Sequence, residues 1–517
     1  MRVVKIIIGS VLIFLATGLS ALRQADMSWT SPEIKSKVNL TFVQDYIEES
    51  EILLPKLPTI RKGSSLSFAL SSFNRFKHSF QNFVGKSEPD NLFFRYDTTQ
   101  NRLSPHRPVR SSLLMRLHSG FESQFSTSDY ENVFLYNGIY ISGTVEDNLQ
   151  FYTYWWDGHF RGDHEYALQS SPIVRGWYKS PKHHGRLYMN ELWAKLSYVS
   201  PHAKLSVGRS RHEIGSNIGG SIILNNESTN YGYFSAEFAL GHFELSLLHA
   251  TLIPDSTLAE MEDYSLYYAN MLYDNKYLVT HKLDWYPSDK LHLFAGEVIT
   301  YGNRSLDINY LIPHTFWRII EHRQHDRDKV MIYSGMTYKA NENWTIYGNF
   351  SLDDFSSSEI FGNWWGNKYA IQIGNAFKLK DIRTVFEFTA VRPWMYTHKT
   401  LTTKYTHDSI ALGFPAGANL IQFANEMNIP ISAALSLDIL NSFTRQGSLG
   451  ADPHENYADR PKDTANWLEG EKHNYWQTTV AATCILSPHH RFKIGYSYNE
   501  FMPGYRNRLF LAYQASY

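Results

Sequence analysis

Tryptophan, arginine and carboxylate residues gather at several points where predicted strands give way to long irregular segments. These groups are Trp155–Trp156–Asp157, Trp317–Arg318 with Glu321, Trp364–Trp365, and Arg392–Pro393–Trp394 with Tyr396. Flat aromatic rings stack on sugar rings, and arginine or carboxylate groups bond sugar hydroxyls or a uronate. The groups are therefore candidate contacts for a polysaccharide.

The same aromatic residues have a second explanation, because tryptophan and tyrosine form girdles at both membrane interfaces of a barrel. For any one group, a girdle or simple packing explains the aromatic residues better than a ligand does. Arg318, Glu321 and Arg392 are harder to explain in that way. We expect these three side chains to lie near one another, at the lumen or the extracellular mouth, and to contact polysaccharide. The alternative is a mutual salt-bridge cluster, because buried charges are costly unless they are paired.

Catalysis requires converging acids, bases or nucleophiles, and the sequence lacks the motifs that usually supply them. It contains no G-x-S-x-G, no H-E-x-x-H and no phosphate-binding loop. Asp353 and Asp354 are adjacent, so on a strand their carboxyl groups would face opposite sides, which suits no glycosidase pair. We therefore expect no enzyme, no cofactor and no metal site.

The elements that must position these residues show a period of two from about Ser111 onward. In "NWTIYGNFSL", Trp344, Ile346 and Phe350 alternate with polar residues, and similar runs recur toward the C-terminus. A period of two is typical of strands, whose successive side chains point to opposite faces. We count roughly sixteen to eighteen strands of about ten residues, the length that crosses a bilayer at a tilt.

Short turns alternate with longer connections, as they do in outer-membrane barrels. The long irregular stretches are expected at 157–187, 301–327, 393–430 and 441–473. The final run, "RLFLAYQASY", ends on Tyr517 and would close the sheet so that no edge meets lipid. This terminal aromatic resembles the signal that outer-membrane insertion machinery reads. The sequence therefore predicts an antiparallel outer-membrane β-barrel, with membrane lipid and that machinery as partners.

The N-terminal part differs from the rest of the chain. A positively charged start, an apolar run from Ile6 to Leu19 and Ala21 at a plausible cleavage position predict a signal peptide over residues 1–21. Residues 22–110 are expected to form a small, partly helical segment that is periplasmic or plugs the lumen, and residues 111–517 to form the barrel. The net charge of −1 gives no reason to expect a nucleic-acid partner.

Six segments carry a family resemblance in their order along the chain. They are "LSVGRSRHEIGSNIGGSIILNNESTNYGYF" (205–234), "YLIPHTFWRIIEH" (310–322), "TIYGNFSLDDF" (345–355), "NWWGNKYAIQIG" (363–374), "FEFTAVRPWMYTH" (386–398) and "FPAGAN" (414–419). Together they resemble the Wzi-like capsule assembly family of outer-membrane proteins, including its relatives in gliding bacteria. The similarity covers about 190–420 and extends to the rest of the chain by pattern only.

The resemblance implies a barrel of about eighteen strands with a small N-terminal helical part. It also implies a lectin that attaches or organises capsular polysaccharide at the cell surface. The matching positions are Gly215, Gly219, Gly220, Ser221, Leu224, Asn225, Pro313, Arg318, Glu321, Arg392, Pro393, Tyr396 and His398. The chain departs from the family at Ser216–Asn217–Ile218, which bears on the ligand more than on the fold.

We therefore expect a polysaccharide-binding, lectin-like outer-membrane barrel that acts in capsule or exopolysaccharide assembly and surface attachment. One alternative is a porin-type channel, because a barrel of this size admits water unless loops or side chains fill it. Another is a surface component of gliding motility, which the resemblance allows. Single-channel conductance separates a lectin with a filled lumen from a channel.

Overall fold

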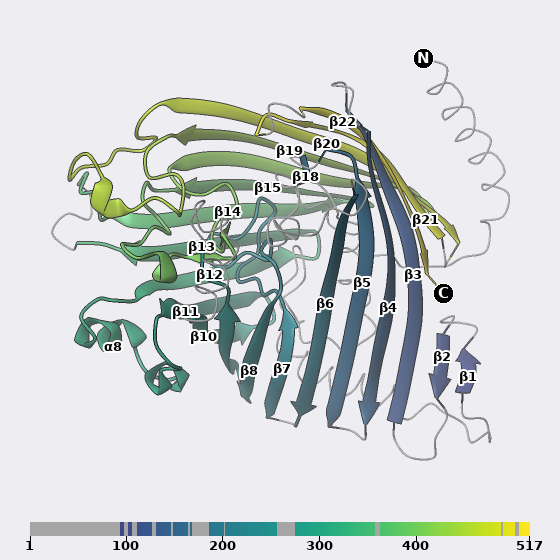
Figure 1. Cartoon of the computed structure of the whole chain (residues 1–517), viewed down its shortest axis with the longest axis horizontal. Helices are drawn as coiled ribbons and strands as arrows, with labels where there is room; N and C mark the ends of the chain where they lie inside the picture. The colour runs from purple at the N-terminus through teal and green to yellow at the C-terminus, as the bar shows by residue number, and fades with distance from the viewer. Residues whose placement is uncertain are drawn as a thin grey trace.

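The strands of the computed structural model close into one antiparallel barrel (Figure 1). The structure describes residues 94–97, 102–105, 111–126, 131–145, 148–163, 166–167, 186–200, 202–255, 275–356, 362–487, 490–501 and 506–516. Eighteen strands form the barrel, which agrees with the sixteen to eighteen expected. They are β3 (Ser111–Ser126), β4 (Glu131–Val145), β5 (Leu149–Arg161), β6 (Arg186–Val199), β7 (Ala203–Ser210), β8 (Tyr231–Leu240), β9 (Phe243–Leu252), β10 (Lys276–Ser288), β11 (Leu291–Gly302), β12 (Lys329–Asn341), β13 (Trp344–Asp354), β14 (Lys368–Leu379), β15 (Ile382–Val391), β18 (Leu420–Ser432), β19 (Leu435–Gly447), β20 (Lys472–Ser487), β21 (His490–Asn499) and β22 (Asn507–Ser516).

A few short elements stand outside the barrel wall. They are the hairpin of β1 (Phe94–Asp97) and β2 (Arg102–Pro105), the helix α8 (Trp317–Arg323), the hairpin of β16 (Thr406–His407) and β17 (Ile410–Ala411), and the 3-10 turns η2 (Ile308–Leu311), η3 (Leu401–Thr403) and η4 (Tyr457–Asp459). β2 meets β3 through the pair Leu103 and Met115. In the part of the chain that the structure describes, no helix has the length and apolar character needed to cross a membrane.

Several expectations concern residues outside this described part. The signal peptide over 1–21, most of the helical segment over 22–110 and the terminal Tyr517 all lie there. These three remain predictions from the sequence.

The last strand closes the barrel against the first. β22 pairs with β3 in antiparallel register, with Tyr513 opposite Phe121 and Ser516 opposite His118. Each barrel strand therefore has a neighbour on both sides, and the wall presents no free edge with unpaired backbone groups.

The period of two in the sequence corresponds to the two faces of this wall. On β15, Phe386 is 51% exposed on the outside, whereas its neighbour Glu387 is 3% exposed and points inward. The same alternation places Phe350 and Phe423 outside while Asn349 and Gln422 point inward. The outer face is therefore apolar, and the inner face carries most of the polar and charged side chains.

Short turns join the strands at one end of the barrel, for example between β6 and β7, between β10 and β11, and between β12 and β13. Long loops join them at the other end, which we call the long-loop end, and Figure 1 shows α8 there. Three expected loops are wrong in part, and in the loop expected at 441–473 residues 441–447 continue β19. Residues 157–161 continue β5, and residues 420–432 form β18, where polar residues such as Asn425 and Asn428 weaken the alternation.

Candidate functional site

Two long loops fold back into the barrel and fill part of its lumen. The first is residues 211–230 between β7 and β8, and the second is residues 392–419 between β15 and β18. We call the two loops together the inner plug. Asn349, Gln372 and Glu387, which point inward from β13, β14 and β15, all hydrogen-bond to the first loop. The first loop therefore crosses the lumen to strands that are far from β7 and β8 in the barrel order.

Glu387 holds the tip of the first loop. Its carboxylate accepts hydrogen bonds from the backbone N–H groups of Ile218 and Gly219, each at 2.8 Å, and from the Tyr347 hydroxyl at 2.7 Å. Three donors offset the cost of burying a carboxylate at this depth. The segment Ser216–Ile218, where the sequence departs from the family that it resembles, is thus part of the tip that meets the wall.

Two glycines allow the tip to approach its neighbours. Gly220 has a φ of +104°, which side chains rarely tolerate, and a Cβ there would stand 2.4 Å from Pro415. At Gly219 the restriction is contact, because a Cβ would stand 2.4 Å from Oε1 of Gln422. A positive φ therefore requires glycine at Gly220, whereas close packing explains Gly219.

The two loops of the inner plug bind each other. The backbone N–H of Asn225 donates to the carbonyl oxygen of Leu412 at 2.7 Å. The hydroxyl of Tyr396 donates to the carbonyl oxygen of Ile222 at 2.8 Å. Displacing one loop would therefore leave polar groups of the other without these partners.

An apolar core surrounds these contacts inside the barrel. Ile222, Ile223 and Leu224 of the first loop are completely buried. They share one cluster with inward residues of the wall and with the second loop: Tyr231, Tyr233, Leu248, Ala250, Leu252, Leu278, Phe294, Val298, Met331, Tyr333, Ala370, Val391, Met395, Tyr396, Tyr405, Leu412, Phe414, Ala418 and Leu420. Porin lumens are polar and filled with water, so this core is unlike a porin channel.

The second loop begins with a strained turn at residues 392–396. Trp394 and Tyr396 have φ values of 65° and 72°, which cost a residue other than glycine about 1–3 kcal/mol each. The Trp394 N–H donates to the carbonyl of Gly450 at 2.8 Å, and the Tyr396 N–H donates to the Asp353 carboxylate at 3.2 Å. Both rings are buried, so these two predicted ligand contacts lie within the packed interior.

Arg392 joins separate loops at the long-loop end. Its guanidinium donates to the carbonyl oxygens of Asn367, at 3.2 Å, and Ala465, at 3.0 Å. The group also lies against the rings of Tyr369 and Trp467, at 5.9 and 5.4 Å from their centroids. Arg392 is only 4% exposed, so it acts first as a clamp between loops.

Four half-buried aromatic side chains lie at this end, two of them (Tyr369 and Trp467) against the clamp, and we call Trp365, Tyr369, Tyr457 and Trp467 the aromatic rim. The Trp365 and Tyr457 rings are 5.2 Å apart, and the Tyr369 and Trp467 rings meet edge-on at 6.0 Å. The guanidinium of Arg460 stands 3.9 Å from the Trp365 ring centroid. The aromatic rim therefore consists of two pairs of partly exposed rings, one against Arg460 and the other against Arg392.

A buried group of charges lies beside the Trp365–Tyr457 pair of the aromatic rim. The Lys368 ammonium lies 5.2 Å from the centroid of Tyr457 and 3.4 Å from Asp353, and Lys329 pairs with the same carboxylate at 2.5 Å. Burial, together with the nearby lysines, lowers the pKa of His398 to about 3, so that its imidazole is neutral. Two ammonium groups and one carboxylate leave positive charge beside these rings.

The helix α8 lies on the outer face of the wall. Trp317 is completely buried and stacks on His281, with ring centroids 3.9 Å apart. His281 shares its face of β10 with Leu283, which is exposed on the outside. Glu297 of β11 accepts hydrogen bonds from the backbone N–H groups of Trp317, at 2.6 Å, and Arg318, at 3.2 Å. This carboxylate satisfies free N–H groups at the start of the helix and complements its dipole.

Arg318 and Glu321 pair with each other at 3.1 Å, and Arg318 also lies 3.7 Å from Asp354. Burial raises the pKa of Glu321 to about 7, while Arg318 lowers it and Asp326 raises it. Among the described residues, Arg392 makes no hydrogen bond, ion pair or ring contact with Arg318 or Glu321, and its own partners are Asn367, Ala465, Tyr369 and Trp467. The expected proximity of the three side chains stays a prediction.

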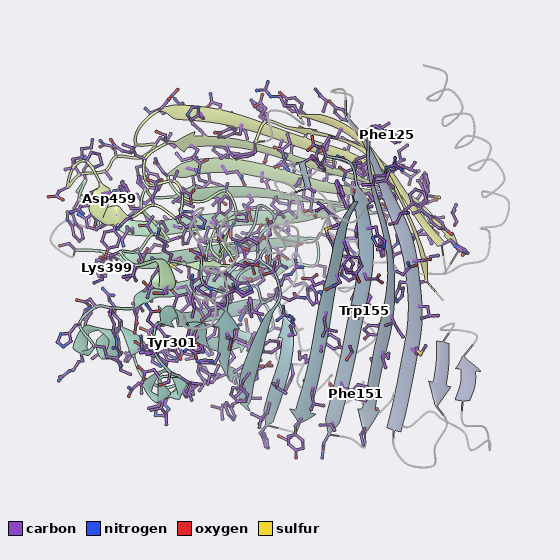
Figure 2. All side chains as sticks on the ribbon, viewed as in Figure 1. Phe125, Phe151, Trp155, Tyr301, Lys399 and Asp459 are labelled. Atoms are coloured by element: carbon purple, nitrogen blue, oxygen red, sulfur yellow. The ribbon has the colours of Figure 1, made fainter. Side chains whose placement is uncertain are left out.

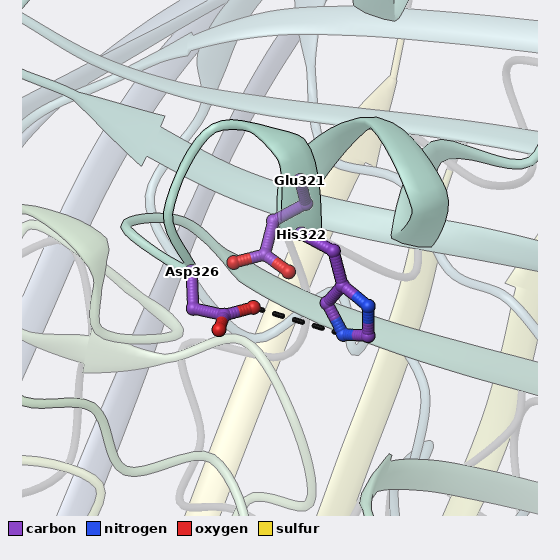
Figure 3. A group of neighbouring side chains, drawn as sticks. All are labelled: Glu321, His322 and Asp326. Atoms are coloured by element: carbon purple, nitrogen blue, oxygen red, sulfur yellow. Dashed lines mark ion pairs between the residues drawn. The ribbon is translucent and has the colours of Figure 1, made fainter.

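One group on this segment could hold a metal ion. Glu321, His322 and Asp326 each offer a ligand atom, and these atoms lie within 4.8 Å of one another. Figure 3 shows the ion pair between His322 and Asp326, whose atoms are 3.6 Å apart. Both of these side chains are exposed, and one oxygen of Glu321 already pairs with Arg318. Exposed groups of this kind are common without a metal, and we assign none here.

Trp155, Trp156 and Asp157 lie within β5 and not at its junction with a loop, so their expected placement is wrong. Trp156 is completely buried on the inner face, edge-on to Phe134 at 5.7 Å. Trp155 is 43% exposed on the outer wall (Figure 2). Asp157 is half-buried on the same outward side of the strand as Trp155. The three residues therefore belong to the barrel wall and not to the aromatic rim.

Sequence reasoning missed Glu387, Tyr457 and Trp467. A signal for Glu387 was present, because it alternates with Phe386 and Phe388 and was therefore an inward carboxylate in a strand. Tyr457 and Trp467 lie in the long loop between β19 and β20, where no period relates residue number to position.

Comparison with known proteins shows similarity only in three-dimensional structure. No protein-family model matches the chain, and no curated protein matches it. Wzi of Escherichia coli, described as an outer membrane protein involved in group 1 capsule assembly and a carbohydrate-binding β-barrel, is 10% identical, with a TM-score of 0.49 over 88% of this chain and 89% of that chain. OccK5 (OpdH) of Pseudomonas aeruginosa is 8% identical, with a TM-score of 0.43 over 79% of this chain and 97% of that chain. OprD of the same organism is 10% identical, with a TM-score of 0.42 over 79% and 93%.

Proposed function

We propose that this protein spans the outer membrane and binds polysaccharide at its long-loop end, in capsule or exopolysaccharide assembly and surface attachment. The aromatic rim is the observation that carries the proposal. Its rings are partly exposed, they belong to the long-loop end of the barrel, and arginine and lysine side chains lie against them. Rings of this kind stack on sugars, and the basic groups can bond hydroxyl or acidic substituents.

The outer wall supports a membrane partner. Large apolar side chains are exposed on every side of the barrel: Met115, Leu117, Leu135, Trp155, Leu192, Leu196, Leu205, Val207, Phe234, Leu283, Ile332, Met336, Phe350, Ile373, Phe386, Phe423, Trp476 and Leu509. Soluble monomers rarely expose a continuous apolar surface of this extent. An apolar belt around a closed barrel suits membrane lipid.

The inner plug favours a binding protein over an open channel. Its apolar core would have to leave the lumen before water could fill a continuous path. A channel nevertheless remains the second candidate, because inward polar groups such as Asn349, Gln372 and Glu387 would line the lumen if the first loop moved away. A role in gliding motility has only the sequence resemblance in its favour.

Glycan-array binding by the detergent-purified protein tests the proposal. Tyr457→Ala and Trp467→Ala should each weaken polysaccharide binding by at least about tenfold, or ~1.4 kcal/mol, if the rings stack on sugar. Trp344→Ala is the matched control, because Trp344 is an exposed aromatic residue beside a short turn at the other end of the barrel. Heat-modifiable gel mobility confirms that each variant is folded.

Two results would count against this function. One is equal binding by the rim variants and the Trp344→Ala control. The other is a stable, large conductance of the wild-type protein in planar bilayers, which would favour the channel.

A further inference from the structure

The loop between β11 and β12, which contains η2 and α8 and is called the η2–α8 segment, covers a part of the outer wall that would otherwise face lipid. Beneath it lie Val279 of β10, Ile299 of β11 and Val330 of β12, all nearly or completely buried. They form one apolar cluster with Tyr310 and Trp317 of the segment. The segment therefore replaces the exposed surface of three strands with its own outer surface.

The segment is held firmly in this position. Asp328 accepts hydrogen bonds from the Arg304 guanidinium, at 2.8 and 2.6 Å, and from the Tyr310 hydroxyl, at 2.7 Å. Gln324 donates to Asp307 at 3.1 Å, which ties the end of α8 to the start of the segment. Its outward face is therefore a fixed surface.

That outward face carries large apolar side chains. Ile308 is 72% exposed, Ile312 is 37%, Phe316 is 74% and Ile319 is 60%. Single exposed apolar residues need no explanation, but several on one short segment indicate an interaction surface.

The height of the apolar wall that the segment leaves exposed indicates what contacts the outward face of the segment. On β12 the exposed apolar residues run from Ile332 to Tyr338, which is about 20 Å along a strand. At a strand tilt of about 40°, this run gives roughly 16 Å of height, whereas the apolar band of an outer-membrane barrel is about 25 Å tall. A helix about 10 Å across restores the missing height.

We propose that the η2–α8 segment lies among the acyl chains and headgroups of the outer-membrane leaflet at the long-loop end, and completes the lipid-facing belt over β10–β12. The inference rests on the membrane-spanning part of the proposed function. Its apolar surface continues that of Ile332 and Met336 on the wall. The exposed His322 and Arg323 at the end of α8 face the headgroup region, where charged side chains are tolerated.

Fluorescence quenching by lipid tests this placement in the full-length protein. Cys484 is the only cysteine, so Cys484→Ala gives a background for single cysteines that carry an environment-sensitive fluorophore. The test sites are Phe316→Cys and Ile319→Cys. Met336→Cys reports the bare wall, and Asp459→Cys reports an exposed loop at the same end of the barrel. The proteins are reconstituted in phosphatidylcholine vesicles whose acyl chains carry a nitroxide near the headgroup or deep in the chain.

Labels at Phe316 and Ile319 should be quenched by the shallow nitroxide more than by the deep one, because interfacial helices sit about 5–10 Å into the boundary. The label at Asp459 should be quenched several times less. If Met336 is quenched while Phe316 and Ile319 behave like Asp459, the inference is wrong and the membrane barrel stands. If Met336 is not quenched either, the membrane-spanning proposal itself fails, and this inference fails with it.

Discussion

Replacing Glu387 with alanine should free the tip of the inner plug without opening the barrel. The carboxylate accepts backbone hydrogen bonds from Ile218 and Gly219 at 2.8 Å. A hydrogen bond to a charged group contributes about 1.5–3 kcal/mol net, so these two bonds hold the tip by roughly 3–6 kcal/mol. Their loss should raise the population of conformations in which residues 216–220 are detached from β15.

The base of the same loop is held more strongly by apolar burial. Ile222, Ile223 and Leu224 are completely buried, and each such side chain contributes about 1.5–3 kcal/mol, or roughly 4.5–9 kcal/mol together. The bond between Asn225 and Leu412 adds to this. Because the burial term is the larger one, the base should stay docked in the Glu387→Ala variant. Deletion of residues 216–224 removes both terms and should open a path for water.

Two measurements on the reconstituted protein check this reasoning. Hydrogen exchange should quicken at the amides of residues 216–220 in Glu387→Ala and remain slow at residues 223–225. Planar-bilayer conductance should stay closed in the wild type and in Glu387→Ala, and should appear in the deletion. Glu122→Ala is a matched control, because Glu122 is also a buried inward carboxylate but bonds Gln124 on its own strand.

Unchanged exchange at the tip of Glu387→Ala would show that the carboxylate does not hold the loop. A steady open conductance in Glu387→Ala would show that the apolar base contributes much less than calculated. Either result would refute the division of the plug into a polar tip and an apolar base.

Three further changes have expected outcomes. Arg392→Gln should lower the melting temperature in heat-modifiable gels, because it weakens two hydrogen bonds between loops. Each of these bonds contributes about 1.5–3 kcal/mol. Normal stability with weakened polysaccharide retention would instead support direct ligand contact. Trp156→Ala should cost about 3–5 kcal/mol in urea unfolding, whereas Trp155→Ala, which empties no interior site, should cost much less. Burial raises the pKa of Asp408 from 3.8 to about 6, and the Asp255 charge adds to the rise. The folded state therefore holds this proton more tightly, so stability from the group falls as pH rises from about 4 to about 6, by up to about 3 kcal/mol. Asp408→Asn should remove that dependence. The check is the melting temperature of the wild type and the variant at several pH values, and the same pH dependence in both proteins would contradict the reasoning.

The strands were predictable because a two-faced wall imposes its period directly on the sequence. Where the period was clear, as in "NWTIYGNFSL", the prediction and β13 agree. It failed where polar residues occupy both faces, as at Asn425 and Asn428 of β18. The alternation depends on lipid outside and polar groups inside, and it weakens near the short turns, where water can reach both faces.

The candidate site was less predictable because loops have no such period. Arg392 was recognised as unusual for a girdle, but its partners Asn367 and Ala465 lie in two other loops. Contacts between segments so far apart in the sequence depend on how the barrel closes. Residue type alone could not distinguish a guanidinium that bonds backbone carbonyls from one that binds a sugar.

Carboxylates within strands are nevertheless informative about loops. Glu297 pairs across β11 and β12 with Ile332, which is exposed on the outer wall, so its side chain starts from the lipid-facing side. A charge in that position would be costly in lipid, and the cost is avoided because α8 covers it and donates two backbone N–H groups. Glu387 serves the plug tip in the same way from the inner face. A loop that folds back onto a wall brings backbone N–H groups that need acceptors. An acidic residue within a strand can therefore mark the place where such a loop contacts the wall.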